Sequence, residues 1–157
     1  MILMPRLLDA EGFAPFGTLA HLPAPGARSD VGPAQNLRDG VAPCLRWAVA
    51  RRTPLPLRVT TMERHRYSSQ SFIPLTGARW LVLVAPKNAA DGPDMARAMA
   101  FCLDGTQAIT YAPDVWHHPL TALDDGAGFA VLTFLDGSGN DDEFVAIADG
   151  ITVEVQA

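Results

Sequence analysis

Four side chains of types that bind metal ions or move protons lie in two short stretches of this sequence. Glu63 and His65 stand two residues apart, and His117 and His118 are adjacent further along the chain. In an extended strand, side chains two residues apart point to the same side, with Cβ atoms about 7 Å apart. Carboxylate and imidazole are both common metal ligands, so Glu63 and His65 are able to hold one ion between them.

The residues around this pair alternate as they do in a half-buried strand. One face of 57–66 begins apolar and ends in Glu63 and His65, and the other carries Arg58, Thr60, Met62, Arg64 and Arg66. Polar groups at the end of a core face predict a functional interior. The alternative is a solvated strand edge with charges paired for solubility. In both interpretations, alternation predicts that Arg64 and Arg66 face solvent.

The elements that must position these residues are predicted to be strands. The chain has 157 residues, 48% of them hydrophobic and 18% charged, which suits one domain spanning 1–157. Thirteen Gly and thirteen Pro, scattered as single residues, favour short strands joined by turns. We therefore expect an all-β sandwich or barrel with one or two short helices, the first starting at Asp9 and ending before Pro15. The strands are expected at 44–51, 57–66, 71–74, 80–85, 98–103, 108–111, 118–122, 128–134 and 151–155.

Two other segments carry structural expectations. The stretch 21–43 is rich in Pro, Gly, Asp and Ser, so it is predicted to be a long loop with a short strand around Val31. The run from Trp80 to Val84 is apolar at every position. Such a run is typical of a central strand covered on both faces or of a strand at a subunit interface.

Composition and charge exclude several functional classes. Twelve basic and seventeen acidic side chains give a net charge of −5 without a run of Lys or Arg, so a nucleic-acid partner is not expected. No apolar run reaches the roughly 18 residues that span a bilayer, and the first residues lack the pattern of a secretory signal. The two cysteines share no metal-ligand spacing, which favours a reducing compartment. We expect a cytoplasmic protein without a membrane partner.

The spacing of the polar residues resembles the two motifs of cupin barrels. Glu63 stands where the first histidine of the cupin His-x-His pair would be, and His65 is the second. Gln70 occupies the position of the motif's carboxylate, and Gly77 falls at the expected distance. In the second motif, which follows a proline turn at Pro113, His118 matches the metal ligand. His117 is its neighbour and, on an extended backbone, points to the opposite side. The resemblance implies a cupin-like β-barrel of the jelly-roll type.

The same stretches resemble the ureidoglycolate lyase family, also called ureidoglycolate hydrolase. The similarity is carried by Glu63-Arg64-His65, the string 69–77, the string 111–120 with Trp116-His117-His118-Pro119, and the opening 11–17. It covers residues 7–18 and 57–145. The resemblance implies a homodimeric lyase that splits (S)-ureidoglycolate into glyoxylate and urea in allantoin and purine nitrogen degradation. It also implies a divalent metal, commonly nickel.

The resemblance and the chemistry together suggest roles for the site residues. Breakdown of a carbinolamine needs a base for the hydroxyl proton, an acid for the departing nitrogen and a cation for the developing charge. His65 and His118 are expected metal ligands, with Glu63 as a third ligand or the base. Gln70 is expected as a neutral ligand or a hydrogen-bond partner of the substrate. His117 is expected as the general acid or, alternatively, as a surface or interface histidine.

Two aromatic residues and two departures from the family pattern leave alternatives open. Tyr111 and Trp116 are candidates for substrate contacts or for barrel core. The family usually has an Asn-rich segment and an Arg-Tyr pair where this chain reads Gln35-Asn36-Leu37-Arg38, and an Asp-Arg pair where it reads Asp136-Gly137. These departures motivate two other hypotheses. One is a cupin isomerase or dioxygenase acting on a related small hydroxy or ureido acid, and the other is a non-catalytic cupin that binds a metabolite.

Overall fold

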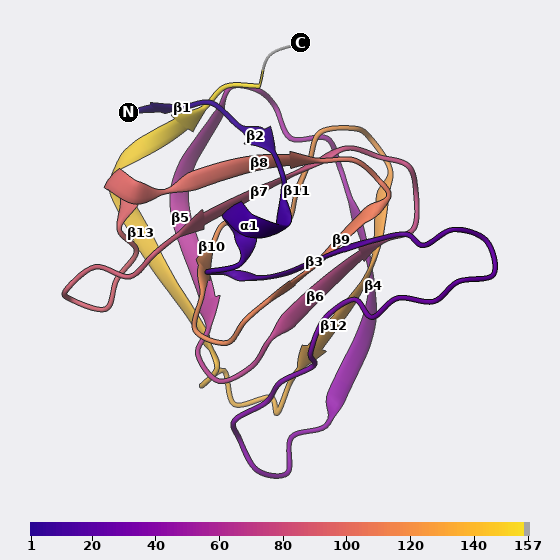
Figure 1. Cartoon of the computed structure of the whole chain (residues 1–157). Coiled ribbons are helices and arrows are strands. Elements are labelled where there is room, and N and C mark those ends of the chain that lie inside the picture. Colours follow the sequence, from indigo (N-terminus) through magenta and orange to yellow (C-terminus); the bar gives the residue numbers. More distant parts are fainter. Residues whose placement is uncertain (156–157) are drawn as a thin grey trace.

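The computed structural model describes residues 1–155, apart from the side chain of Asp149, and it is built almost entirely of strands (Figure 1). One short helix, α1 (Ala10–Phe13), and a 3-10 turn at Met95–Arg97 are its helical elements within these residues. The strands are β1 (Ile2–Leu3), β2 (Arg6–Leu7), β3 (Gly17–His21), β4 (Pro43–Ala50), β5 (Leu57–His65), β6 (Gln70–Pro74), β7 (Trp80–Ala85), β8 (Met99–Leu103), β9 (Gln107–Tyr111), β10 (Trp116–His117), β11 (Thr121–Ala122), β12 (Ala127–Phe134) and β13 (Asp142–Val153).

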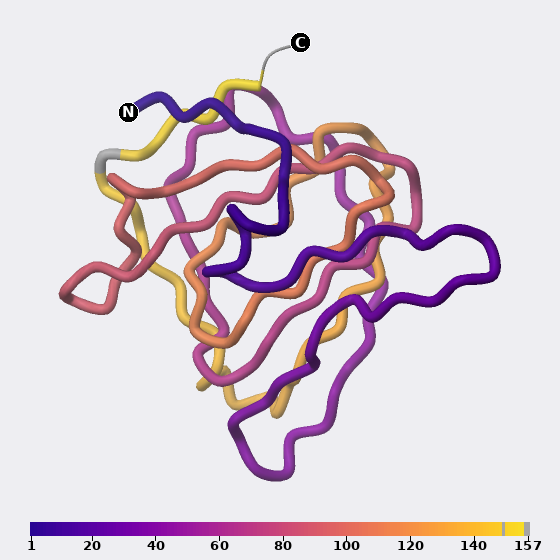
Figure 2. Tube along the Cα trace, viewed as in Figure 1, coloured from indigo at the N-terminus to yellow at the C-terminus, as the bar shows by residue number. Residues whose placement is uncertain are grey.

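The strands form two sheets that curl toward each other. The larger sheet has the order β1-β13-β5-β10-β7-β8-β2, with β11 also paired to β7. The smaller sheet has the order β3-β9-β6-β12-β4, so β4 is one of its edges. The Cα trace shows that the beginning and the end of the described chain lie side by side, since β1 runs parallel to β13 (Figure 2). This arrangement confirms the predicted all-β, cupin-like fold.

The element predictions hold for most of the chain. Asp9 caps α1, its side chain accepting a hydrogen bond from the Gly12 amide at 2.7 Å. The stretch 22–42 is largely loop and projects from the sheets in two arms (Figure 2). The strand predicted around Val31 does not form in the described chain, and the Val31 carbonyl accepts a hydrogen bond from the Thr110 hydroxyl at 3.3 Å.

The last strand is much longer than its predicted range of 151–155. β13 begins at Asp142 and pairs with β5 in two runs, separated by a register shift between Ala146 and Ile151. The irregular stretch between the two runs interrupts the alternation of apolar and polar residues that is typical of a strand. The sequence therefore predicted only the second run, which begins at Ile151. Within the described residues, no helix of this structure is long and apolar enough to cross a membrane.

Strand β7 separates two apolar cores. Trp80, Val82 and Val84 belong to the core that includes residues of the smaller sheet, here called the inner core. Leu81, Leu83 and Ala85 belong to a second core, here called the outer core. All six residues of β7 are buried, so this strand is covered on both faces by its own chain. The predicted central strand is therefore correct, and this strand is not available for the alternative subunit interface.

Candidate active site

The pairing of β10 decides which side chains face the interior. His117 lies opposite Val84 of β7 and opposite Glu63 of β5. Residues directly opposite each other in antiparallel strands point to the same face. Val84 belongs to the inner core, so Glu63 and His117 also point inward, and His65 follows two residues after Glu63. The register thus brings three polar groups from two strands to one interior wall.

These three residues form a compact cluster, here called the Glu63–His65–His117 group. One potential ligand atom from each lies within 4.8 Å of the others. The Nε2 atom of His117 is 3.3 Å from Oε1 of Glu63, and the two imidazole centroids are 5.6 Å apart. Both histidines are buried. The first sequence interpretation, a functional interior at the end of β5, fits this arrangement, whereas a solvated strand edge does not.

Each histidine of the group is oriented through its Nδ1 atom. His65 Nδ1 is 2.8 Å from Oδ1 of Asp142, which lies opposite His65 on β13. His117 Nδ1 is 2.9 Å from the carbonyl oxygen of Val115, and the ring stacks on Tyr111 with centroids 4.1 Å apart. A carbonyl only accepts, so His117 donates from Nδ1 and its Nε2 atom is directed at Glu63. Both Nε2 atoms are buried, and Glu63 Oε1 is the acceptor that lies 3.3 Å from that of His117.

The electrostatic surroundings keep Glu63 ionised. Burial alone opposes the charged form of this carboxyl. The contact with His117 and the positive potential of His65, His117 and His118 together outweigh burial and lower the pKa of Glu63 below its ordinary value. Burial also raises the pKa of Tyr111, which therefore remains a neutral phenol beside the group. Glu63 consequently contributes a negative charge to this interior wall at neutral pH.

Gln70 faces the same interior from the smaller sheet. It pairs with Tyr111 in the register of β6 and β9, and Tyr111 belongs to the inner core. The Oε1 atom of Gln70 is buried and has no hydrogen-bond partner. Trp80 of β7 also leaves its indole nitrogen buried and unpaired. Unsatisfied buried polar atoms are rare in folded proteins, so the presence of several facing the interior from both sheets is typical of a ligand site.

The structure brings His117, rather than the predicted ligand His118, into the compact group with Glu63 and His65. His118 follows the end of β10, and its Nδ1 lies 2.9 Å from the Thr121 hydroxyl and 3.0 Å from the Pro119 carbonyl. Burial lowers its pKa. The role of His118 as a metal ligand stays a prediction.

Two further predictions concern the opposite face of the larger sheet, and the one for Arg64 is wrong. Trp116 lies opposite Ala85 and belongs to the outer core, where its indole nitrogen donates to the Asp91 carbonyl at 3.0 Å. This position fits the barrel-core alternative given for Trp116 from the sequence. Arg64 does not face solvent: its side chain is 1% exposed and is paired with three carboxylates. Arg66 is partly exposed, as expected, and pairs with Asp91.

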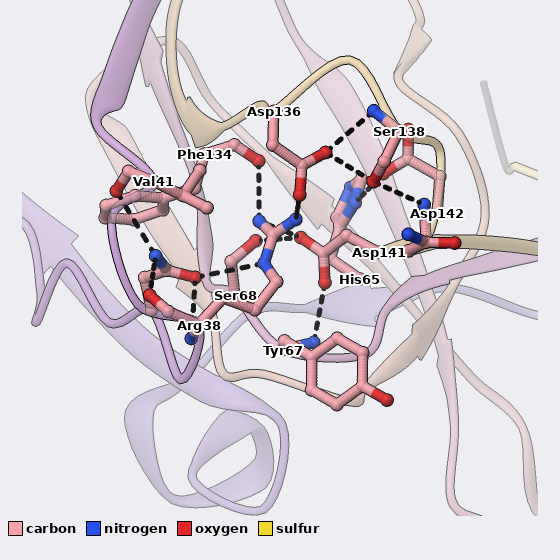
Figure 3. A network of polar contacts seen from close by, with 12 residues as sticks. Arg38, Val41, His65, Tyr67, Ser68, Phe134, Asp136, Ser138, Asp141 and Asp142 are labelled. Carbon is pink, nitrogen blue, oxygen red and sulfur yellow. Dashed lines mark hydrogen bonds and ion pairs between the residues drawn. The ribbon is translucent and has the colours of Figure 1, made fainter.

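The segments that depart from the family pattern meet in one network beside His65 (Figure 3). Arg38 donates to Asp136 at 2.8 Å and to Asp141 at 2.9 Å. Asp141 also accepts from the Ser68 hydroxyl and from the Tyr67 amide. The next residue, Asp142, orients His65. Sequence reasoning did not assign Asp142 this role, although the acidic pair at 141–142 was a visible signal.

Comparison with known proteins decides the family. A sequence model of the family described as ureidoglycolate lyase matches residues 1–154. The chain belongs to the ureidoglycolate lyase family. This assignment confirms the family inferred from the motifs, and it does not favour the alternative of a cupin isomerase, dioxygenase or non-catalytic binding protein.

Individual members of the ureidoglycolate lyase family are similar to this chain at moderate identity. The ureidoglycolate lyase of Burkholderia cepacia is 37% identical over 142 residues, which cover 83% of this chain and 78% of that protein. The ureidoglycolate lyase of Azotobacter vinelandii is 41% identical over 60% of this chain, and that of Brucella ovis is 44% identical over 55%. The matched regions span about half of the latter two proteins, 56% and 48%.

The donor set of this family member fits a divalent cation. Two imidazoles and one carboxylate are ligands that zinc, nickel and iron accept. The Nδ1 contacts to Asp142 and to the Val115 carbonyl match the second contacts that orient metal-binding histidines. The unpaired Nε2 atoms are the atoms that such an ion would use. A second cluster, His65 with Asp141 and Asp142, fits less well because Arg38 and Ser68 already satisfy Asp141.

Proposed function

We propose that this member of the ureidoglycolate lyase family cleaves ureidoglycolate to glyoxylate and urea at the Glu63–His65–His117 group. The observation that carries the proposal is the convergence of three ionisable side chains on one interior wall, with two imidazole nitrogens and the Gln70 oxygen left unpaired. Curated relatives that carry this activity in their names are 37–44% identical to the chain.

The reaction is an elimination that needs no water, oxidant or covalent nucleophile. The bond between the central carbon and the urea nitrogen breaks, the hydroxyl oxygen becomes the aldehyde oxygen of glyoxylate, and the hydroxyl proton moves to nitrogen. The oxygen and the nitrogen are bonded to the same carbon, so one carboxyl group can take the proton from the first and return it to the second. Glu63 is ionised and faces the interior, and we assign it this role.

The histidines of the group and Gln70 are proposed to bind the cation and to orient the substrate. His65 and His117, with one oxygen of Glu63, are the proposed ligands of a divalent cation, and the other oxygen of Glu63 remains for proton transfer. When bound, the cation supplies Lewis-acid stabilisation of the substrate's carboxylate and developing alkoxide. Gln70 Oε1 is the proposed acceptor for the N–H groups of the urea moiety. This allocation moves His117 from the expected acid to the ligand set, because its Nδ1 is held by the Val115 carbonyl and its Nε2 lies among the potential ligand atoms of Glu63 and His65.

A direct assay tests the proposed function. Chelator-treated protein is incubated with racemic ureidoglycolate, without added metal and with nickel, zinc, manganese or iron, and urea and glyoxylate are quantified. The proposal predicts equal amounts of the two products, formed far faster than in the buffer control, and faster with a divalent cation than without. Release at the spontaneous rate with every cation would overturn it.

We also propose that the protein is a homodimer joined through strand β4. Leu45, Trp47 and Val49 of this edge strand are 67%, 80% and 78% exposed. Residues two apart share one face, so they form an apolar stripe next to the unpaired backbone groups of the edge. A second copy of β4, running antiparallel, satisfies both features at once because such a contact is self-complementary.

The mass of the protein in solution tests the dimer. Light scattering after gel filtration is expected to give twice the chain mass of 16.8 kDa for the unchanged protein and a single chain mass for Trp47→Glu. Leu22→Glu, which changes an equally exposed loop residue, is the matched control and is expected to stay dimeric. A monomeric unchanged protein, or a dimeric Trp47→Glu variant, would contradict this interface.

We place the reaction in the cytoplasm, in the degradation of allantoin for nitrogen. Both cysteines are free thiols, which suits a reducing compartment. The substrate is a ureido acid, which fits a preceding reaction that opens a purine-derived ring. Fractionation of cells that express the chain checks the location, and activity in the membrane or external fraction would argue against it.

A further inference from the structure

The outer face of the larger sheet carries a second polar cluster directly behind the Glu63–His65–His117 group. Its members are sequence neighbours of the inward-facing residues. Arg64 lies between Glu63 and His65, Trp116 precedes His117, and Glu143 follows Asp142. Alternation along a strand sends neighbours to opposite faces, so each outer residue shares its backbone with an inner one. Contacts on the outer face therefore fix the backbone that positions the inner side chains.

Arg64 is the centre of the outer cluster. Its Nε and Nη2 donate to Glu143 Oε2 at 2.9 and 2.7 Å, and Nη2 also donates to Asp91 Oδ2 at 2.8 Å. Nη1 donates to Asp114 Oδ1 at 2.8 Å and to the Asp91 carbonyl at 3.2 Å. The guanidinium also lies 4.4 Å from the centre of the Trp116 ring. The five N–H donors thus make five contacts, which connect β5 to the segments of Asp91, Asp114 and Glu143. A lysine cannot reproduce this arrangement.

Two of the carboxylate partners adopt a strained backbone. Asp91 and Asp114 have φ angles of 65° and 68°, and they are the two non-glycine residues with positive φ that residues 1–155 contain. Such residues persist where their surroundings hold them, and they concentrate at functional sites. The Asp114 amide also donates to the His65 carbonyl at 2.7 Å. The ion cluster therefore stabilises the turn that leads into β10 and its His117.

We propose that Arg64 is a positioning residue that sets the separation of Glu63, His65 and His117 from the outer face of the sheet. The guanidinium joins β5, which carries Glu63 and His65, to the turn that leads into β10 and His117, and to the first residues of β13, which carry Asp142. The expected effect of Arg64 on turnover rests on the proposed function. The expected effect of Arg64 on the positions of His65 and His117 is independent of that function.

The test compares Arg64→Lys with Arg79→Lys. The lysine substitution keeps the positive charge at position 64, but all of its N–H donors lie on a single nitrogen atom. Arg79 also pairs with an aspartate, Asp124, but lies on the surface with a side chain that is 63% exposed, so it is the matched control. Three quantities are measured: the imidazole nitrogen and proton resonances of metal-free protein, the affinity for NiCl2 by calorimetry, and kcat and KM for ureidoglycolate.

Loss of positioning predicts a specific pattern in Arg64→Lys. The resonances of His65 and His117 shift, the affinity for Ni²⁺ falls about 10-fold or more, and kcat falls about 10-fold or more with a smaller change in KM, because small misplacements of reacting groups are costly. Arg79→Lys is expected to match the unchanged protein in all three. A variant Asp114→Asn keeps the side-chain shape and tolerates positive φ, so it removes the ion pair without a backbone penalty. It is expected to shift His117 more than His65.

Separate outcomes overturn the inference and the proposed function. Folded Arg64→Lys and Asp114→Asn proteins with unchanged histidine resonances and with Ni²⁺ affinities within about twofold of the original would show that Arg64 is structural only. If Arg64→Lys does not fold, Asp114→Asn decides by the same criteria. The resonances require neither metal nor substrate, so they decide the inference even if the unchanged protein does not cleave ureidoglycolate.

Discussion

The two faces of the sheet around β5 and β10 hold polar groups in opposite states. On the inner face, His65 and His117 each leave a buried Nε2 atom without a hydrogen-bond partner, and Gln70 of the smaller sheet does the same with its Oε1 atom. On the outer face, every N–H of Arg64 has an acceptor. Unsatisfied buried atoms cost free energy, whereas a fully connected network stabilises a local geometry. The outer face therefore holds the backbone in place, and the inner face presents free polar atoms that can bind a ligand.

The largest expected effect comes from removing the inner charge. Glu63→Gln keeps the size of the side chain but cannot accept the hydroxyl proton, so turnover is expected to fall by about 10²- to 10⁴-fold. Thermal stability is expected to fall modestly, because the contacts that lower the pKa of Glu63 favour its charged form in the folded protein. Steady-state rates and a melting curve measure both. The control is Glu154→Gln, which changes an exposed glutamate. A Glu63→Gln protein with more than about a tenth of the original rate would remove Glu63 from the chemistry.

Removing the charge of Arg64 on the outer face is expected to lower the stability of the fold. Replacing Arg64 by Met leaves three carboxylates without their shared partner, so the free energy of unfolding is expected to fall by about 2–3 kcal/mol. The figure is below the range for fully buried pairs because Asp91, Asp114 and Glu143 are partly exposed. Urea unfolding followed by fluorescence measures it. A loss of less than about 0.5 kcal/mol would show that the cluster does not stabilise the fold.

The contacts of Asp91 in the same cluster predict that the stability of the protein depends on pH. Hydrogen bonding to Arg64, with a further contribution from Lys87, holds the pKa of Asp91 well below its usual range. A carboxyl whose pKa is lowered by folding contributes stability above its unfolded pKa, near 3.9, and that stability is lost as the pH falls through the folded value. Asp91→Asn is therefore expected to lower the urea midpoint at pH 7, and the difference from the original protein is expected to shrink below pH 4. A difference that is constant from pH 7 to pH 3 would contradict this origin.

The smallest effect is expected at an exposed ion pair away from both faces. Arg79 and Asp124 lie 2.8 Å apart, with side chains that are 63% and 36% exposed. Solvent screens such pairs, so Arg79→Ala is expected to change the free energy of unfolding by less than about 1 kcal/mol and to leave turnover unchanged. Comparable losses in Arg79→Ala and Arg64→Met would mean that burial does not distinguish the two arginines.

Much of this comparison could be predicted from the sequence. The alternation of 57–66 correctly placed Glu63 and His65 on one face, and the turn residues around β5 to β9 gave strands close to those observed. The motif strings were sufficient for the family, which the family match confirms. These features are local, because a period of two and a turn residue depend on near neighbours along the chain.

The remaining features depend on contacts between distant segments. His117 and His118 differ by one position in register, and only the pairing of β10 with β5 shows which one points inward. Arg64 reads as a solvent-facing arginine until Asp91, Asp114 and Glu143 are brought around it. The role of Asp142 likewise follows from the pairing of β13 with β5. Sequence spacing alone does not specify such partners.

The central claim is that the inner face of β5 and β10 forms a chiral site for ureidoglycolate. The most direct test follows racemic ureidoglycolate with the unchanged, cation-supplemented protein and analyses the residual substrate by enantiomer once rapid urea release stops. A chiral site predicts a rapid phase that ends with half of the substrate consumed and one enantiomer remaining. Urea release no faster than in buffer, or equal loss of both enantiomers, would contradict it.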